Sequence, residues 1–377
     1  MMPLAISLSA VWGKVWPIGL AILFFGVLIL SHELGHFLSA KAFKIRVTEF
    51  AMGMGPKLLS FGKGETKYVV KLLPFGGSCM MDEDVEHSDD PRAFINQKPW
   101  KRFIVLAAGA IVNILCGVLI AAVMLGSAAL QPDPMHRLIG TPVVRASEAG
   151  SLTYESGLRE GDVFKKIGSH KVFAYMDIRF LLSRDSDRIV DLTVERDGQE
   201  ILMRNFAFAT GEYEDGTKGY AQDFLLLGVP VTFGNTVKYA AAESLSMSRL
   251  VYLSLLDMIG GKFSLRDISG PVGVVNIITE QAQDAQAQIG QDKAAALDAL
   301  QNLLFLCALI SINIGLMNLL PIPALDGGRL LFTLIEMIIR KPVPRKFEAY
   351  VHAGGMAVLM LFMVLITFKD IVQLFQK

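Results

Sequence analysis

Two histidines and a glutamate stand close together at the end of the first apolar stretch. The segment His32-Glu33-Leu34-Gly35-His36 has the form H-E-x-x-H. Residues four apart share one face of a helix, so both imidazoles can reach one zinc ion at about 2.0–2.1 Å. Glu33 is rotated from His32 by about 100° around the helix, which places its carboxylate beside the metal. There it can accept a proton from a water that the metal activates, so the pattern predicts a zinc-dependent hydrolytic site.

The apolar residues before this motif place it at membrane depth. Residues 16–30 carry no charged side chain. At about 1.5 Å per residue His32 lies roughly 24 Å beyond Trp16, and the hydrocarbon core of a bilayer is about 30 Å thick. Ionisable side chains at this depth are costly and usually mark function. The structural alternative is a polar cluster at a helix end that reaches toward the lipid headgroups.

A catalytic zinc ion with two histidine ligands needs a third protein ligand. The residues directly after His36 offer none, and the candidate is Asp326, far downstream. It follows the apolar run 303–320 and two prolines, Pro321 and Pro323, which predict irregular backbone. Such backbone is tolerated at membrane depth only where it is buried in protein or lines a cavity. An ordinary Asp-Gly turn just outside the membrane is the alternative interpretation.

Taken together, H-E-L-G-H at 32–36 and N-L-L-P-I-P-A-L-D-G-G at 318–328 resemble the signature of the site-2 protease family, bacterial intramembrane zinc metalloproteases. The resemblance implies a zinc ion (Zn2+) whose ligands are His32, His36 and Asp326. It also implies two further site residues: Glu33 as catalytic base, and Asn318 as a contact to the substrate strand or the developing oxyanion.

The same resemblance implies a substrate class. Members of the family cut single-span membrane proteins that have already been trimmed on the outside, such as anti-sigma factors and signal-peptide remnants. The cut falls within or near the transmembrane segment, in regulated intramembrane proteolysis. We therefore expect single-span membrane proteins and the lipid bilayer as partners.

Composition agrees with a membrane protein. The chain has 377 residues, of which 52% are hydrophobic, and a formal net charge of zero. The apolar excess is concentrated in blocks. The absence of a net positive charge argues against a nucleic-acid partner. The three cysteines, Cys79, Cys116 and Cys307, are scattered and odd in number, so neither a disulfide framework nor a cysteine zinc site is expected.

The distribution of cations predicts the orientation in the membrane. Lysine and arginine gather after the first apolar run, before the second, and at 340–346, whereas only Lys14 precedes the first run. The positive-inside rule therefore places these loops in the cytoplasm and the N-terminus outside. We expect a multi-pass protein of the bacterial inner membrane with His36 and Asp326 toward the cytoplasmic side. A cleaved signal peptide is disfavoured, because cleavage would remove the zinc motif.

The sequence of residues 46–101 predicts β structure in addition to a loop. Gly53-Met54-Gly55-Pro56 indicates a turn, and Thr66–Leu73 is typical of a strand that ends at Pro74. A β-hairpin beside a membrane site could offer its edge to an unwound substrate, or it could simply cover the helix bundle.

Residues 131–230 turn polar and resemble a PDZ domain. The resemblance rests on the pattern G-L-x-x-G-D at 157–162, followed by a helical stretch near 175–184 and an alternating strand at 189–198. The domain is predicted to lie outside the cytoplasm, where it would bind a peptide ligand or exclude large substrates sterically.

The predicted fold class is a polytopic α-helical membrane protein with about four transmembrane helices, a membrane-associated β-hairpin or sheet, and an inserted β-rich PDZ-like domain. The expected segments are a first transmembrane helix with the zinc motif (1–45), the β region (46–101), a second transmembrane helix (102–130), the PDZ-like domain (131–230), amphipathic interfacial helices (231–301), a third transmembrane helix with a cytoplasmic loop (302–349), and a fourth transmembrane helix (350–377).

Two other functions remain open at this point. A non-enzymatic membrane scaffold that presents a PDZ domain would bind no metal. A metal or proton transporter would need polar residues across the whole bilayer, whereas the polar residues here lie near one face only.

Overall fold

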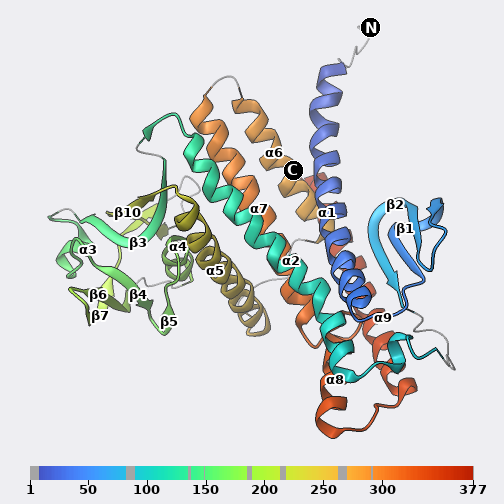
Figure 1. The fold of residues 1–377 in the computed structure, drawn as a ribbon. Helices are drawn as coiled ribbons and strands as arrows, with labels where there is room; N and C mark the ends of the chain where they lie inside the picture. Colours follow the sequence, from blue (N-terminus) through green and yellow to red (C-terminus); the bar gives the residue numbers. More distant parts are fainter. Residues whose placement is uncertain are drawn as a thin grey trace. The chain divides into compact units, whose positions relative to one another are not determined.

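The computed structural model describes residues 8–81, 90–134, 137–147, 149–184, 189–212, 218–261, 270–289 and 292–376 (Figure 1). The chain divides into two compact units. Unit 1 comprises Met1–Gly117 and Asp257–Lys377, and unit 2 comprises Val118–Leu256.

Within the described ranges, four helical segments are long and apolar enough to cross a membrane, which agrees with the predicted number. They are Val15–Ala42 within α1 (Leu8–Ala42), Pro99–Leu130 formed by α2 (Pro99–Ser127) and the short helix η2 (Ala128–Leu130), α7 (Lys293–Leu319), and Arg345–Gln373 within α9 (Arg345–Gln376). Proline is well suited to the first helical position because its missing N–H has no partner there, which explains why α2 begins at Pro99.

The segment before the third span contains a helix boundary. α6 (Pro271–Gln288) ends there, and α7 begins at Lys293. The side chain of Asp292 accepts hydrogen bonds from the amides of Ala294 and Ala295, so it caps a new helix at this point. Within unit 1, α6 packs beside both α7 and α1, as Figure 1 shows.

The predicted cytoplasmic loop after the third span is largely helical. After α7 the backbone is irregular from Leu320 to Leu325, and then α8 (Asp326–Ile339) begins with Asp326 itself. The prolines therefore interrupt the helical backbone at the expected place, but only for six residues. Apolar residues of α8 such as Leu330 are buried on one side of the helix, which explains why it forms.

The predicted β region forms a sheet of its own from β1 (Glu49–Phe61) and β2 (Lys67–Met80). The prediction that the strand ends at Pro74 is wrong, because β2 continues to Met80. Within β1, Gly53 and Gly55 have φ angles of +89° and +87°. These left-handed conformations produce the bend that the sequence suggested as a turn.

This bend gives β1 two arms with different registers. Residues Glu49–Met52 run parallel to Lys67–Val70 on one side and antiparallel to Gly77–Met80 on the other. The second arm of β1 pairs antiparallel with β2, with Phe61 opposite Tyr68. The arm Glu49–Met52 is therefore paired on both sides. The sheet packs against α1, where the ring of Phe37 lies tilted against Phe50 and edge-on to Tyr68.

Unit 2 contains a β domain whose main sheet has the strand order β10-β3-β4-β6-β7, with β5 added beside β4. Its elements are β3 (Leu138–Ser147), α3 (Leu152–Glu155), β4 (Val163–Ile167), β5 (His170–Lys171), α4 (Tyr175–Ser183), β6 (Ile189–Arg196), β7 (Gln199–Ala207) and β10 (Phe224–Pro230), with a separate hairpin of β8 (Thr210–Glu212) and β9 (Lys218–Tyr220). The predicted helix near 175–184 and the strand from 189 are thus present.

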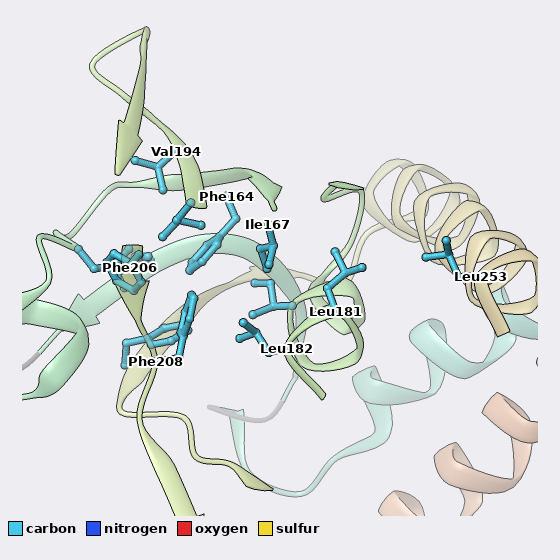
Figure 2. Packing of buried hydrophobic residues seen from close by; sticks show 13 residues of the cluster. Phe164, Ile167, Leu181, Leu182, Val194, Phe206, Phe208 and Leu253 are labelled. Carbon is cyan, nitrogen blue, oxygen red and sulfur yellow. The ribbon is translucent and has the colours of Figure 1, made fainter. Parts of the chain in front are cut away.

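The core of this domain is apolar and rich in phenylalanine (Figure 2). Phe164, Phe206 and Phe208 are each almost completely buried, and Leu253 joins the cluster from α5 (Phe233–Ile259). Asp162 of the G-L-x-x-G-D pattern is fully buried and pairs with Arg196, whose Nε lies 2.6 Å from its carboxylate. The pattern is therefore structural: it fixes the turn that leads into β4.

Candidate metal centre

The histidine motif and the distant aspartate meet in unit 1. His32 and His36 extend from one face of α1, and Asp326 is the first residue of α8. Oδ2 of Asp326 lies 2.9 Å from Nε2 of His32 and 3.2 Å from Nε2 of His36, and the two Nε2 atoms are 3.1 Å apart. Residues separated by 294 positions in the chain thus present three potential ligand atoms around one point.

The donor set and its spacing fit a zinc ion. Ligand atoms about 2.0 Å from a tetrahedral zinc are roughly 3.3 Å from each other, close to the distances found here. Nδ1 of His36 donates a hydrogen bond to the carbonyl oxygen of Val105 at 2.8 Å, which leaves the Nε2 lone pair of His36 for a metal. Second contacts of this kind orient metal-binding histidines in proteins. Three protein ligands with an open fourth position are typical of catalytic zinc.

Gly109 on α2 leaves room for this cluster. A Cβ atom at Gly109 would lie 2.5 Å from Nε2 of His36 and 2.8 Å from Cε1 of His32. The two helices approach closely because Gly35 in turn lies against the backbone of Ala108. Nothing local in the sequence indicated that Gly109 borders the proposed ligand atoms.

Glu33 lies against the β sheet. A Cβ atom at Gly77 of β2 would lie 2.7 Å from Cγ of Glu33, and the backbone of Cys79 is a hydrogen-bond partner of the Glu33 carboxylate. The sheet thus fixes one side of this carboxylate. The sequence suggested a substrate edge or a covering sheet for β2, and it gave no sign of this direct contact.

The irregular segment before Asp326 is held by α9. Ala324 has a φ angle of +80°, unusual for a residue with a side chain, and its amide donates a hydrogen bond to Nδ1 of His352. Gly327 and Gly328 lie against the backbone of Leu320 and Ile322, where no side chain would fit. His352 is half-buried against this segment.

Electrostatics favour a charged Asp326, which lies just outside the spanning helices. Burial alone raises the pKa of its carboxyl group, but the hydrogen bonds to His32 and His36 outweigh burial and hold this pKa well below its usual range. A carboxylate is the form that binds a metal ion.

Two asparagines of unit 1 differ in their surroundings. Asn318 is half-buried near the end of α7, and within the described part of the chain its carboxamide has no hydrogen-bond partner. Asn113 on α2 is fully buried. Its side-chain oxygen accepts a hydrogen bond from Ser31, and its carbonyl oxygen accepts one from Ser311 of α7. Through these two hydrogen bonds Asn113 connects α2 to α1 and α7.

Comparison with known proteins places these residues in a wider group. The family model described as Peptidase family M50 matches residues 20–362. A relative from Clostridium acetobutylicum, whose name describes a zinc metalloprotease, is 35% identical over 94% of this chain and 96% of its own length. The Regulator of sigma-W protease RasP of Bacillus subtilis is 29% identical over 94% of this chain and 98% of its own length. The Zinc metalloprotease RasP of Bacillus licheniformis is also 29% identical over 94% of this chain.

Proposed function

The chain belongs to peptidase family M50, the site-2 proteases, and is a zinc metalloprotease, and we propose that it cleaves peptide bonds within or near the transmembrane segments of single-span membrane proteins. The observation that carries this proposal is the meeting of His32, His36 and Asp326 at the end of an apolar helix long enough to span a membrane. Because members of this family are metalloproteases, the family assignment argues against the scaffold and transporter alternatives.

In this proposal His32, His36 and Asp326 hold the zinc ion. When bound, zinc would act as a Lewis acid that polarises the scissile carbonyl and lowers the pKa of water. The chain's own residues orient this chemistry. Val105 fixes the ring of His36, and Gly109 keeps the space beside both imidazoles free of side-chain atoms.

Glu33 is the proposed general base. It follows His32 directly on α1, and Gly77 and the backbone of Cys79 limit where its carboxylate can lie. Its carboxylate would take the proton of the attacking water and pass it to the leaving amine, which leaves Glu33 unchanged after each turnover.

Substrate binding is assigned to Asn318 and the β sheet. A transmembrane helix hides its carbonyl groups in internal hydrogen bonds, so a substrate must unwind before it can be cut. The carboxamide of Asn318 is free to donate to an exposed carbonyl group, which supports its proposed contact with the substrate strand or the developing oxyanion. Since β2 contacts Glu33, an extended substrate that pairs with the sheet would pass close to the base.

The proposed setting is the inner membrane of a bacterium, with the metal centre toward the cytoplasmic side. The four candidate spans support a multi-pass protein, and the cations after the first span and at 340–346 support this orientation. Pre-trimmed proteins such as anti-sigma factors and signal-peptide remnants are the proposed substrates, because a trimmed substrate has no large outer domain to exclude.

The β domain of unit 2 is proposed to be a PDZ-like domain outside the cytoplasm. Its single main sheet with two short helices supports this assignment. We favour a role as a size filter for substrates. Peptide binding is the second candidate, favoured by β10, which lies at the edge of the sheet with Leu225 exposed and has one side open to an added strand.

The test uses purified protein in micelles and a short single-span substrate, offered with and without a bulky outer domain. We expect the wild type to cut only the trimmed substrate. Glu33→Gln should bind one zinc ion per chain and cut neither substrate, with a loss of at least about 10² in rate, since general-base catalysis contributes about 10²–10⁴.

His32→Ala provides the companion measurement, because it should lose zinc as well as activity. Turnover by Glu33→Gln at the wild-type rate would remove Glu33 from the chemistry. Equal cutting of trimmed and untrimmed substrates would disprove the size filter and leave the protease assignment intact.

A further inference from the structure

Unit 1 contains a second polar site apart from the metal centre. A cavity of about 230 Å³ lies among the beginnings of α2, α8 and α9 and the short helix η1 (Phe94–Asn96). Its polar lining comes from Arg102, Arg329, Thr333, Arg345, Glu348 and His352. We propose that this cavity binds the phosphate group of an anionic phospholipid headgroup.

The charge of the lining suits a phosphodiester. Arg102 forms an ion pair with Glu336, and Glu348 provides one further carboxylate beside Arg329 and Arg345. Among the described residues that line the cavity or pair with its lining, three guanidinium groups face two carboxylates, which leaves an excess of one positive charge. Arginine binds phosphate oxygens with paired N–H donors, and a single phosphodiester carries one negative charge.

Arg102 also offers a donor that the protein leaves unused. Its Nε–H is buried, and within the described part of the chain it has no hydrogen-bond partner. A buried N–H group without a partner is unfavourable, and a ligand oxygen that accepts from it offsets this penalty. Because Arg102 lines the cavity, a phosphate group there lies within reach of this guanidinium group.

The position of the cavity favours a lipid over a soluble phosphate. Arg102 lies in the first turn of the span that begins at Pro99, and Arg345 is the first residue of the span Arg345–Gln373. Since both residues line one cavity, the cavity lies where two spanning helices begin, at the depth of lipid headgroups. Basic pockets between transmembrane helices at this depth bind anionic headgroups.

Apolar residues around the cavity suit the rest of a lipid. Phe94, Ile95 and Leu106 belong to the lining. Tyr350, next in sequence to the lining residue Ala349, is 77% exposed. A soluble phosphate would gain nothing from these side chains, whereas the glycerol and acyl groups of a lipid would pack against them.

The test titrates the purified full-length protein in neutral detergent with phosphatidylglycerol, phosphatidylcholine or inorganic phosphate. Bound molecules are counted by native mass spectrometry. We expect one phosphatidylglycerol per chain, bound more tightly than phosphatidylcholine. Arg345→Gln and Arg329→Gln should each weaken its binding roughly fivefold, the factor that corresponds to about 1 kcal/mol per basic residue near a membrane.

Lys346→Gln is the matched control, because it removes the same charge from the exposed residue next to Arg345 and does not line the cavity. Its affinity for phosphatidylglycerol should equal that of the wild type. If Lys346→Gln weakens binding as much as Arg345→Gln, the attraction is diffuse and the site is disproved. Binding of inorganic phosphate as tight as that of the lipid, or equal binding of the two lipids, would also overturn the proposal.

Discussion

The amide of Ala324 donates a hydrogen bond to Nδ1 of His352, with 3.1 Å between the two nitrogen atoms. This contact joins α9 to the irregular segment that ends at Asp326. Because Ala324 has a φ angle of +80°, its conformation is strained and depends on neighbouring contacts. We therefore expect His352 to position the third proposed zinc ligand through this segment.

His352→Phe should therefore weaken zinc binding. The phenyl ring keeps most of the packing but accepts no hydrogen bond, so the strained conformation of Ala324 loses one of its supports. Removal of contacts that orient metal ligands costs about 10–100-fold in metal affinity or activity, and we expect a loss in this range. Competition with a fluorescent zinc chelator measures the affinity directly.

Tyr350→Phe on the same helix is the control, since Tyr350 is exposed and should leave zinc affinity unchanged. His352→Asn should recover part of the loss, because its side-chain oxygen can accept from an amide. Wild-type zinc affinity in His352→Phe would show that the Ala324 contact does not position Asp326.

Gly109→Ala should abolish zinc binding while the protein stays folded. The new methyl group would occupy space 2.5 Å from Nε2 of His36, too close for any real Cβ contact. The two imidazoles must then move apart or rotate, and the metal centre loses its geometry. Metal content per purified chain, measured by plasma mass spectrometry, tests this.

Gly126→Ala on the same helix is the control for Gly109→Ala. Its Cβ atom would meet nothing closer than 4.0 Å, so this variant should keep one zinc ion per chain. If Gly109→Ala also keeps its zinc, the space beside the imidazoles is wider than the structure indicates.

Gly77→Ala should separate zinc binding from catalysis. Its Cβ atom would lie 2.7 Å from Cγ of Glu33 and 3.2 Å from the carbonyl oxygen of Ala51, and neither neighbour is a proposed zinc ligand. The Glu33 carboxylate has to shift, whereas His32, His36 and Asp326 remain in place. We expect a normal zinc content and a loss of about 10² in turnover, because small misplacements of catalytic groups have effects of this size.

Gly64→Ala, in the turn between β1 and β2, is the matched control, since nothing lies within 4 Å of its added Cβ atom. It should cut the trimmed substrate at the wild-type rate. Loss of zinc in Gly77→Ala would contradict the prediction, because it would mean that the sheet supports the metal ligands rather than the base.

The sequence predicted best what depends on local spacing. His32 and His36 are one helical turn apart, so their shared face follows from helix geometry alone. Asp326 could be found only as a candidate, because no local rule brings together residues 294 positions apart; its place beside the histidines depends on how the helices of unit 1 pack.

What the sequence missed acts through backbone atoms of distant segments. Gly109, Gly77 and His352 matter because of what lies against them, and no property of their own neighbours in the sequence indicates it. The prolines before Asp326 were correctly interpreted as a break. The helix that begins immediately afterwards was missed, because its amphipathic pattern starts at the break itself.

We expect the stability of unit 2 to depend on pH through Glu243. It lies on α5, is 7% exposed, and neighbours the buried Asp177 of α4, which itself pairs with Arg249. Burial raises the pKa of Glu243 to about 8 from an ordinary 4.5, and the negative charge of Asp177 adds to the shift. The folded protein therefore holds a proton that the unfolded chain releases above about pH 4.5.

The sign of the effect follows from this difference. The contribution of the protonated Glu243 to stability is complete below about pH 4.5 and is lost as the pH rises toward 8. Glu243→Gln keeps the shape of the neutral acid but cannot ionise. At pH 9 this variant should be more stable than the wild type by an amount on the order of a few kcal/mol, and at pH 5 the difference should be small.

Hydrogen exchange of peptides from α4 and α5 in the intact protein measures this difference when wild type and variant are compared at the same pH. Glu200→Gln removes a carboxylate from the exposed surface of β7 and should change exchange at neither pH. If wild type and Glu243→Gln are protected equally at pH 9, Glu243 is ionised in the folded state without penalty. The folded protein would then not hold a proton on the Glu243 carboxyl group, and any pH dependence of the stability of unit 2 would have to arise from another group.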